Sequence, residues 1–218
     1  MQTFRTSKAK ENILSRIRRA LNSERLPMPF PDAEKMNNEV FAGSGQEVEE
    51  TFAESFIKLG GKFVFCENEQ ELLEQINNLY DSRGWQHLFC AEPRLLQVFQ
   101  NNKINIVEPA DINNSHADAC ITGCEYLVAR TGSVYISSKQ HLGRTATVFY
   151  PVHIIVAYAG QVVPDIGDGL NLLKKKYGSA LPSMINLNTG PSRTADIEKT
   201  LVVGVHGPGE VFCFLVNG

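Results

Sequence analysis

The residues best suited to chemistry gather in one stretch, TGPSRTADIEKTLVVGVHGPGEV, which runs from Thr189 to Val211. It holds two turns rich in glycine and proline, at residues 190–192 and 206–209, on either side of the apolar run 201–205. Loops that carry function on a rigid sheet have this arrangement. The stretch therefore predicts a buried strand with polar residues gathered at both of its ends.

The first of these turns has the chemistry of an anion site. Ser192 is a good N-cap for a helical turn over residues 193–198, and the free N–H groups of such a turn attract negative charge. Arg193 adds a five-donor guanidinium that suits a carboxylate or phosphate, and Asp196, three residues further on, could orient it. The predicted binding residues are Gly190, Ser192, Arg193, Thr194 and Asp196. The alternative is a capped turn in which the Arg–Asp pair only holds the loop.

A second candidate for holding negative charge is the turn Arg130-Thr131-Gly132-Ser133. It lies between two strand-like runs, and the glycine is typical of a hairpin turn. Two hydroxyl groups and exposed backbone N–H groups could form an anion-binding nest from Thr131, Gly132 and Ser133. The alternative is a plain β-turn.

The titratable candidates are one carboxylate and two histidines. Glu125 lies inside the apolar run 120–128, where burial would make it a desolvated acid, base or nucleophile, unless strand alternation turns it to solvent. His153 and His206 flank strands and could do acid/base work, with packing as the alternative. We prefer His206, because the loop that contains Arg193 precedes the apolar run 201–205 and the turn that contains His206 follows it. The two turns would then lie at opposite ends of that strand, so they could share a site only if the strand were short or a neighbouring subunit closed the site.

Composition excludes several classes of protein. The chain has 218 residues, a net charge of −3, 43% apolar and 21% charged residues, so it has no overall basic footprint for nucleic acid. No apolar run approaches the ~18 residues of a membrane span, and no secretory signal is visible. P-loop, GxGxxG, GxSxG and HExxH patterns are absent from the sequence. Five scattered cysteines indicate reduced, buried thiols in a cytoplasmic protein, and no metal site is expected.

The elements that must position these residues follow an α/β pattern. A basic amphipathic helix over 7–23 and a proline-rich linker over 26–38 form a first region, 1–38, and a compact domain follows over 39–218. In that domain helices and strands alternate, which predicts a parallel sheet with helices on both faces. Helices are expected at 46–59, 68–80, 93–100 and 165–177. Strands are expected at 62–66, 86–91, 104–107, 119–128, 133–138, 149–159, 183–188, 201–206 and 211–216.

Three segments together resemble the LUD-domain family, in particular its lactate-utilization C type. They are ITGCEYLVARTGSVYISS over 121–138, Pro151-Val152-His153, and GPSRTADIEKTLVVGVHGP over 190–208. The likeness extends from about Val40 to the C-terminus. It implies a NagB/RpiA/CoA-transferase-like fold, a mixed sheet flanked by helices. One departure is Arg130, which stands where the family commonly has an acidic residue.

The resemblance also implies a function. The chain would bind a small anionic metabolite and act in a system that oxidises L-lactate to pyruvate. Iron–sulfur clusters would be carried by partner subunits, with no cofactor on this chain, and a homo-oligomer is possible. Two alternatives remain open. One is a stand-alone acyl- or CoA-transferase-like enzyme that uses Glu125, and the other is a non-catalytic assembly subunit that docks through residues 1–38.

Overall fold

The computed structural model describes residues 8–22, 47–99, 104–107, 117–141, 144–197 and 200–217. Contacts divide the chain into two units, Met1–Ser44 and Gly45–Gly218, which are described separately below. The predicted linker and the predicted boundary at 38/39 lie outside the described residues.

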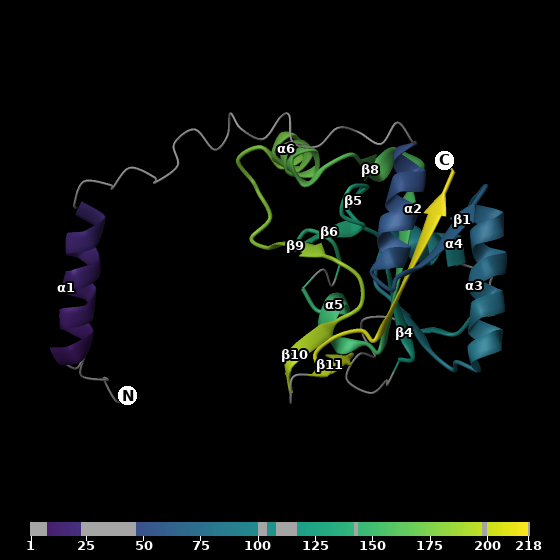
Figure 1. Cartoon of the computed structure of the whole chain (residues 1–218), viewed down its shortest axis with the longest axis horizontal. Coiled ribbons are helices and arrows are strands. Elements are labelled where there is room, and N and C mark those ends of the chain that lie inside the picture. The colour runs from purple at the N-terminus through teal and green to yellow at the C-terminus, as the bar shows by residue number, and fades with distance from the viewer. Residues whose placement is uncertain are drawn as a thin grey trace. The chain divides into compact units, whose positions relative to one another are not determined.

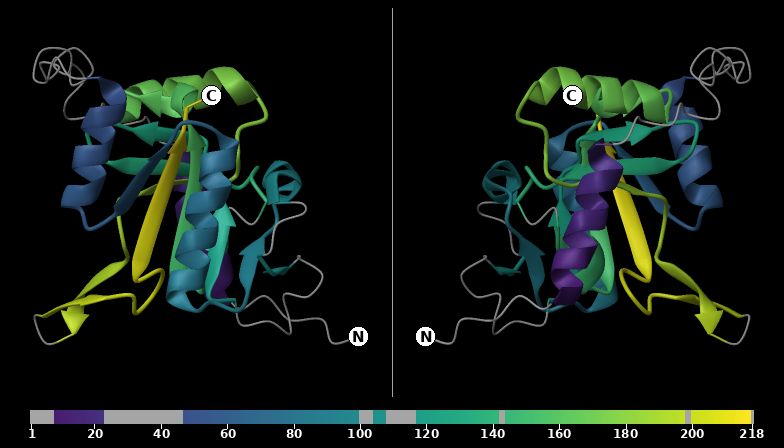
Figure 2. Two further views of the ribbon diagram at one scale, coloured as in Figure 1. Left: turned by 90° about the vertical axis from the view of Figure 1, so that its right-hand side faces the viewer. Right: turned by 90° about the vertical axis from the view of Figure 1, so that its left-hand side faces the viewer.

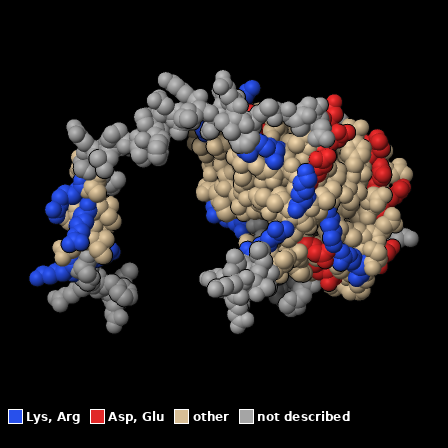
Figure 3. All heavy atoms as spheres, in the orientation of Figure 1, with Lys and Arg blue, Asp and Glu red and all other residues tan. Residues whose placement is uncertain are grey.

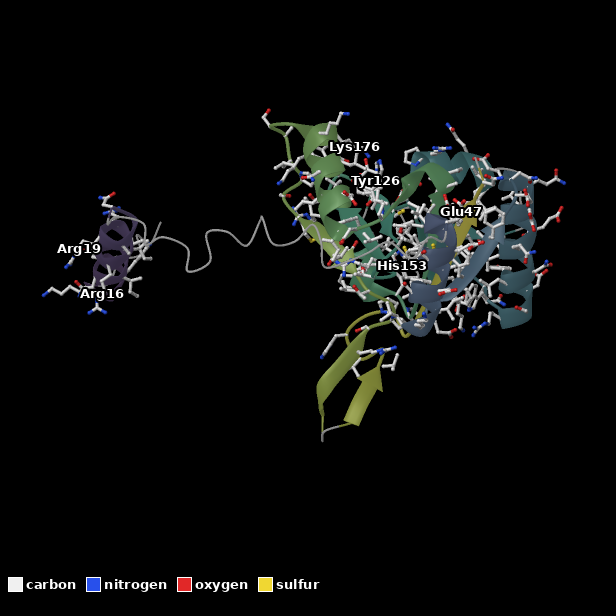
Figure 4. The ribbon with its side chains drawn as sticks, turned by 45° about the horizontal axis from the view of Figure 1, so that its top comes forward. Arg16, Arg19, Glu47, Tyr126, His153 and Lys176 are labelled. Carbon is white, nitrogen blue, oxygen red and sulfur yellow. The ribbon has the colours of Figure 1, made fainter. Side chains whose placement is uncertain are left out.

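The described part of the first unit is a single helix, α1 (Lys8–Asn22), close to the bounds expected from its apolar period. Its stripe of Ile13, Leu14 and Ile17 is exposed, by 58%, 38% and 49% respectively. Basic side chains decorate the rest of the helix, and Figure 4 shows Arg16 and Arg19 extending outward from it.

The second unit is built on a six-stranded parallel sheet with the order β1-β12-β7-β4-β2-β3 (Figure 1). Its long central strands are apolar and buried almost throughout, as expected for a parallel sheet covered on both faces. The strands are β1 (Lys62–Cys66), β2 (Leu88–Cys90), β3 (Ile106–Val107), β4 (Ala119–Thr122), β7 (Val152–Tyr158) and β12 (Glu210–Val216).

Helices α3 (Glu69–Arg83) and α4 (Pro93–Phe99) cover one face of this sheet, and their buried residues form one core with alternate residues of the strands. Helix α3 begins where the Asn68 side chain accepts a hydrogen bond from the Glu71 N–H at 3.0 Å. It ends at Gly84, which has a positive φ. Carboxylates gather over α3 on the surface of the domain (Figure 3).

Helix α2 (Val48–Lys58) and a second, four-stranded sheet cover the opposite face. The second sheet has the order β8-β5-β6-β9 and contains β5 (Tyr126–Val128), β6 (Ser133–Ser137), β8 (Val162–Val163) and β9 (Ile185–Asn188). Helix α6 (Ile166–Tyr177) packs on its far side through Leu173. The helix is capped by Asp165 and ends at Gly178, as the sequence predicted. The mixed α/β fold with a parallel sheet flanked by helices is thus confirmed.

The prediction of one strand over 119–128 is wrong. Residues 119–122 join the main sheet and residues 126–128 join the second sheet, with Gly123 to Glu125 between them. A Cβ at Gly123 would lie 2.8 Å from a carboxylate oxygen of Glu92, so the Glu92 side chain would have to shift to admit one. The chain leaves the main sheet at this close contact. The hairpin that follows, β5 to β6, is confirmed.

The strand expected over 149–159 is also shorter than predicted. It is flanked by the short helix α5 (Ala146–Phe149) and by the 3₁₀ turn η2 (Ala159–Gln161). No helix within the described ranges is both long and apolar enough to cross a bilayer.

Two expectations for the stretch 189–211 are wrong: the helical turn over 193–198 and the buried strand over 201–206. Residues 193–197 form a strand, β10 (Arg193–Ile197), instead of a helical turn, and the next strand is β11 (Thr200–Val203). In the described part of the chain these strands pair only with each other, and Val203 is 53% exposed. The two-stranded ribbon stands away from the domain (Figure 2). Threonine and branched apolar residues favour strand pairing over the local helical turn that Ser192 could cap.

Candidate functional site

A cavity of about 280 Å³ lies between the main sheet, the second sheet and α2. His153 and Val211 come from the amino-terminal ends of β7 and β12, and Phe56 comes from α2. The second sheet supplies one wall, and the turns before β10 and after β11 supply another. The remaining lining residues are Val134, Val148, Ile155, Asn186, Leu187, Asn188, Thr189, Gly190, Pro191, Ser192, His206 and Pro208.

Main-chain hydrogen bonds at the base of the ribbon bring the two predicted turns together. The Ser192 N–H donates to the Pro208 carbonyl at 2.9 Å, and the Gly204 N–H donates to the Ser192 carbonyl at 3.0 Å. The Gly209 N–H donates to the Pro151 carbonyl at 2.9 Å, which ties the base to the start of β7. The expectation that the turns lie at opposite ends of a strand is therefore wrong. Strands β10 and β11 form an antiparallel hairpin, so both turns lie at its base.

Gly190, Ser192 and His206 were predicted as site residues, and the structure places all three along the cavity. Gly190 has φ of +73°, and a Cβ there would lie 3.1 Å from Leu59. The glycine therefore lets the turn pack closely on the end of α2. His206 is exposed at the mouth of the cavity, where its ring can meet both solvent and a ligand.

Asn186 and Asn188 line the cavity but were not singled out in the sequence. Along β9 the side chains alternate between the two faces of the sheet. Ile185 and Leu187 pack against the core that contains Leu173 of α6, and Leu187 also lines the cavity beside the two asparagines. Asn188 pairs with Val134 of β6, another lining residue. The alternation Ile-Asn-Leu-Asn was the available signal, because two carboxamides on the inner face of a strand are unusual in a core.

His153 is almost fully buried, with 1% of its surface exposed, and it lines the cavity from β7. Figure 4 shows it in the interior of the domain. Its Nε2 lies 2.8 Å from the hydroxyl oxygen of Thr122, at the end of β4. Burial lowers the pKa of His153 from 6.5 to about 4, so the imidazole is neutral at physiological pH.

Arg193 does not line the cavity. Its guanidinium donates to the Leu59 carbonyl at the C-terminal end of α2, a position that favours a cation. The side chain thus ties the ribbon to α2. The side chains of Thr194 and Asp196 lie outside the described residues, so the predicted orienting role of Asp196 stays a prediction.

The Thr131-Gly132-Ser133 turn packs against α2 and does not open into the cavity. Gly132 has φ of +58°, and a Cβ there would lie 2.5 Å from the Phe56 nitrogen. The Ser133 hydroxyl lies 2.8 Å from the hydroxyl of Thr189, which itself lines the cavity. Thr131 Oγ1 is buried without a hydrogen-bond partner among the described residues. The turn therefore supports the cavity wall through Ser133.

Arg130, the departure from the family pattern, is held by an acid of the same domain. Its Nε and Nη2 donate to the two carboxylate oxygens of Asp165, each at 2.8 Å. This hydrogen bonding lowers the pKa of Asp165. Because Asp165 also caps α6, the pair links the β5–β6 turn to the start of that helix.

Glu125 is buried, but it lies outside the set of residues that line the cavity. One carboxylate oxygen accepts from the Ser137 hydroxyl at 2.6 Å and the Tyr177 hydroxyl at 2.7 Å, and the other accepts from Lys176 Nζ at 2.8 Å. Burial alone would raise the pKa of Glu125, but these three donors outweigh it and lower the pKa. The surroundings favour a structural ion over the predicted catalytic acid or nucleophile, a role that stays a prediction.

Comparison with known proteins places this geometry in a family. The profile of the LUD domain matches residues 49–216, which include every residue of the cavity. The chain belongs to the LUD domain family. The fold agrees with a crystal structure of a DUF162 family protein from Deinococcus radiodurans. That structure superposes with a TM-score of 0.57 at 18% identity, over 78% of this chain and 96% of that one.

Several curated relatives of this LUD domain carry the name Lactate utilization protein C. The protein from Bacillus velezensis is 37% identical over 103 residues, which is 46% of this chain and 43% of that protein. The protein from Bacillus subtilis is 35% identical over 46% of this chain and 43% of its own length. That from Halalkalibacterium halodurans is 37% identical over 51% of this chain and 47% of its own length. The matches thus span less than half of each of these relatives.

Proposed function

We propose that this LUD domain protein binds a small carboxylate metabolite and serves in an iron–sulfur-dependent system that oxidises L-lactate to pyruvate. The name shared by its curated relatives supports the pathway. The observation that carries the binding role is the cavity, which joins both halves of the stretch 189–211 to a buried, neutral histidine.

The size and lining of the cavity suit a small monocarboxylate. Its volume of about 280 Å³ lies just below the usual range for ligand sites, which begins at roughly 300 Å³. Among the described residues that line it, none is an aspartate, glutamate, lysine or arginine. A carboxylate ligand would therefore meet no like charge and would be held by neutral donors such as Asn186, Asn188 and Ser192. His206, at the mouth, would supply a proton or a positive charge.

In this proposal the anion is held by neutral donors and not by the guanidinium of Arg193, as the sequence predicted. Arg193 would act indirectly, because it fixes the base of the ribbon to α2 instead of reaching the ligand. Thr131, Gly132 and Ser133 would act through Thr189 in the same indirect way. The negative charge would be balanced mainly by the neutral amide donors of the cavity lining.

Electron transfer would be carried by partner subunits. An iron–sulfur cluster needs four thiolates within reach of one another. The five cysteines of this chain are buried, and they are distributed among three separate clusters of the core. Desolvation raises the pKa of the Cys66 thiol to about 11 and that of Cys90 to about 12, which disfavours thiolates. These side chains do not fit a cluster, so the proposed role is in binding the metabolite.

Titration calorimetry with L-lactate and with pyruvate tests the binding role. Asn188→Leu removes a donor at nearly constant volume and should weaken binding of the better ligand about tenfold, since one hydrogen bond to a charged group contributes roughly 1.5 kcal/mol. Asn171→Leu, an exposed change on α6, is the matched control and should bind like wild type. If wild type bound neither compound, or if both variants bound equally well, the cavity would not be a carboxylate site.

Assembly with partners would use α1. Its exposed stripe has the spacing of a helix that lays one face into an apolar groove, and it is flanked by Lys8, Lys10, Arg16, Arg18 and Arg19. We expect Leu14→Glu/Ile17→Glu to abolish co-purification with co-expressed iron–sulfur subunits. An Asn12→Glu/Ser15→Glu variant adds the same charges outside that stripe and should retain it. Loss of co-purification in both variants, or in neither, would contradict docking through the stripe.

The alternative of an acyl- or CoA-transferase-like enzyme requires Glu125 as the nucleophile. Both of its oxygens are already hydrogen-bonded, and the residue lies outside the cavity lining. Intact mass measurement after incubation with an acyl-CoA tests this alternative. A covalent adduct that forms on wild type and is absent from Glu125→Gln would favour the transferase alternative over the binding role.

A further inference from the structure

Thr122 and His153 form a buried polar pair beside the cavity. They come from the neighbouring parallel strands β4 and β7, and their exposed fractions are 3% and 1%. The hydroxyl oxygen of Thr122 lies 2.8 Å from His153 Nε2. His153 lines the cavity, whereas Thr122 does not. Thr122 can therefore influence a ligand only through the imidazole.

The direction of this hydrogen bond follows from the partners that the hydroxyl has. If Nε2 carried the proton, the Thr122 oxygen would accept it and its own O–H would need a second acceptor. The imidazole is the only hydrogen-bond partner of this hydroxyl among the described residues. A buried donor without an acceptor is costly, so the hydroxyl should donate to Nε2. The neutral ring would then carry its proton on Nδ1, which has no hydrogen-bond partner among the described residues and would be the ring atom left to meet a ligand.

We propose that Thr122 is a positioning residue that holds His153 as the Nδ1–H tautomer. The cavity would then select ligands that place an acceptor oxygen beside the Nδ1–H group of His153. The chemical class is that of 2-hydroxy and 2-oxo monocarboxylates. A 2-amino acid of the same size would present an ammonium group to an N–H donor in a lining that, among the described residues, has no carboxylate. This selectivity rests on the proposed binding role, whereas the tautomer does not.

Nitrogen NMR of the imidazole tests the tautomer without any ligand. The His153 signals are assigned by their loss in His153→Asn. We expect an Nδ1–H ring in wild type, the same ring in Thr122→Ser, and a gain of the Nε2–H form in Thr122→Val, which removes only the hydroxyl. An Nε2–H ring in wild type, or an unchanged tautomer in Thr122→Val, would overturn the positioning role.

Calorimetry with pyruvate, L-lactate and L-alanine tests the selectivity. Wild type should bind pyruvate or lactate at least tenfold more tightly than alanine, and Thr122→Val should reduce this ratio about tenfold. Thr122→Ser should restore it. Thr51→Val, which removes a hydroxyl on α2 that donates to the Glu47 carbonyl, should leave the ratio unchanged. A folded Thr122→Val protein, judged by its melting temperature, that kept the wild-type ratio would overturn the selectivity.

The two measurements separate failure of this inference from failure of the proposed function. A wild-type protein that bound none of the three compounds would remove both the binding role and the selectivity, while the NMR result would still decide the tautomer. A protein that bound pyruvate and alanine equally well would keep the binding role and overturn the selectivity alone.

Discussion

The buried His153 makes the stability of the domain depend on pH in a defined window. The unfolded chain takes up a proton at this side chain near pH 6.5, whereas the folded chain does so only near pH 4. Between these values the unfolded state binds more protons, so the free energy of unfolding falls as the pH falls. Above pH 6.5 the ring is neutral in both states, and its full contribution is present.

The size of the effect follows from the two pKa values. A separation from 6.5 to about 4 corresponds to about 3 kcal/mol once both states are protonated, and to about 2 kcal/mol between pH 7 and pH 5. The assay is urea unfolding at pH 7.0, 6.0 and 5.0 for wild type and His153→Asn. Below this range the loss of stability from Glu125, whose pKa is lowered, would begin to contribute.

Between pH 7.0 and pH 5.0 the free energy of unfolding should fall by about 2 kcal/mol more in wild type than in His153→Asn, whatever the absolute stability of the variant. Asn171→Leu, an exposed change on α6 that removes no titratable group, is the control and should keep the wild-type slope. Equal pH slopes for wild type and His153→Asn would refute the reasoning, since the ring would then titrate alike in the folded and unfolded states.

Three further changes test packing, ion pairing and helix capping in the domain, each by urea unfolding at pH 7. Gly132→Ala places a methyl group against the α2 backbone and should lower the free energy of unfolding by about 2 kcal/mol more than Gly84→Ala. Gly84 is the control because it has a similar φ but open space around it. Equal losses would show that α2 moves to admit the methyl group. Lys176→Met leaves the Glu125 carboxylate without its cation and should cost about 1–3 kcal/mol, and a loss that persisted at pH 3 would contradict that origin. Asp165→Ala removes the α6 cap and should cost about 1 kcal/mol, and an unchanged midpoint would mean that the cap adds nothing.

Elements with strong local signals could be predicted from the sequence. Asp165 and Gly178 bound α6, and Asn68 begins α3, because caps act on their own helix and need no distant partner. Helix α3 nevertheless runs past the expected end at Tyr80 to Arg83, and its C-cap is Gly84, which has a positive φ. A glycine that adopts a positive φ is a visible signal for the end of a helix, and Gly84 was that signal for α3.

Features that depend on distant contacts could not be predicted in this way. Residues 119–128 are divided between two sheets at Gly123, whose N–H donates to the carboxylate of Glu92, thirty-one positions away along the chain. The placement of Gly190, Ser192 and His206 in one site depends on the β10–β11 hairpin, because a single strand between them would have kept them apart. Arg193 had the right chemistry for an anion, but the nearby Leu59 carbonyl accepts its hydrogen bond.

The base of the ribbon has a mechanical consequence. The segments that enter and leave β10 and β11 are also a wall of the cavity, and main-chain hydrogen bonds clamp them to each other and to Pro151. The ribbon and the cavity wall are therefore coupled through the same main-chain hydrogen bonds. A displacement of β10 and β11 relative to the domain would break those bonds or change the shape of the cavity.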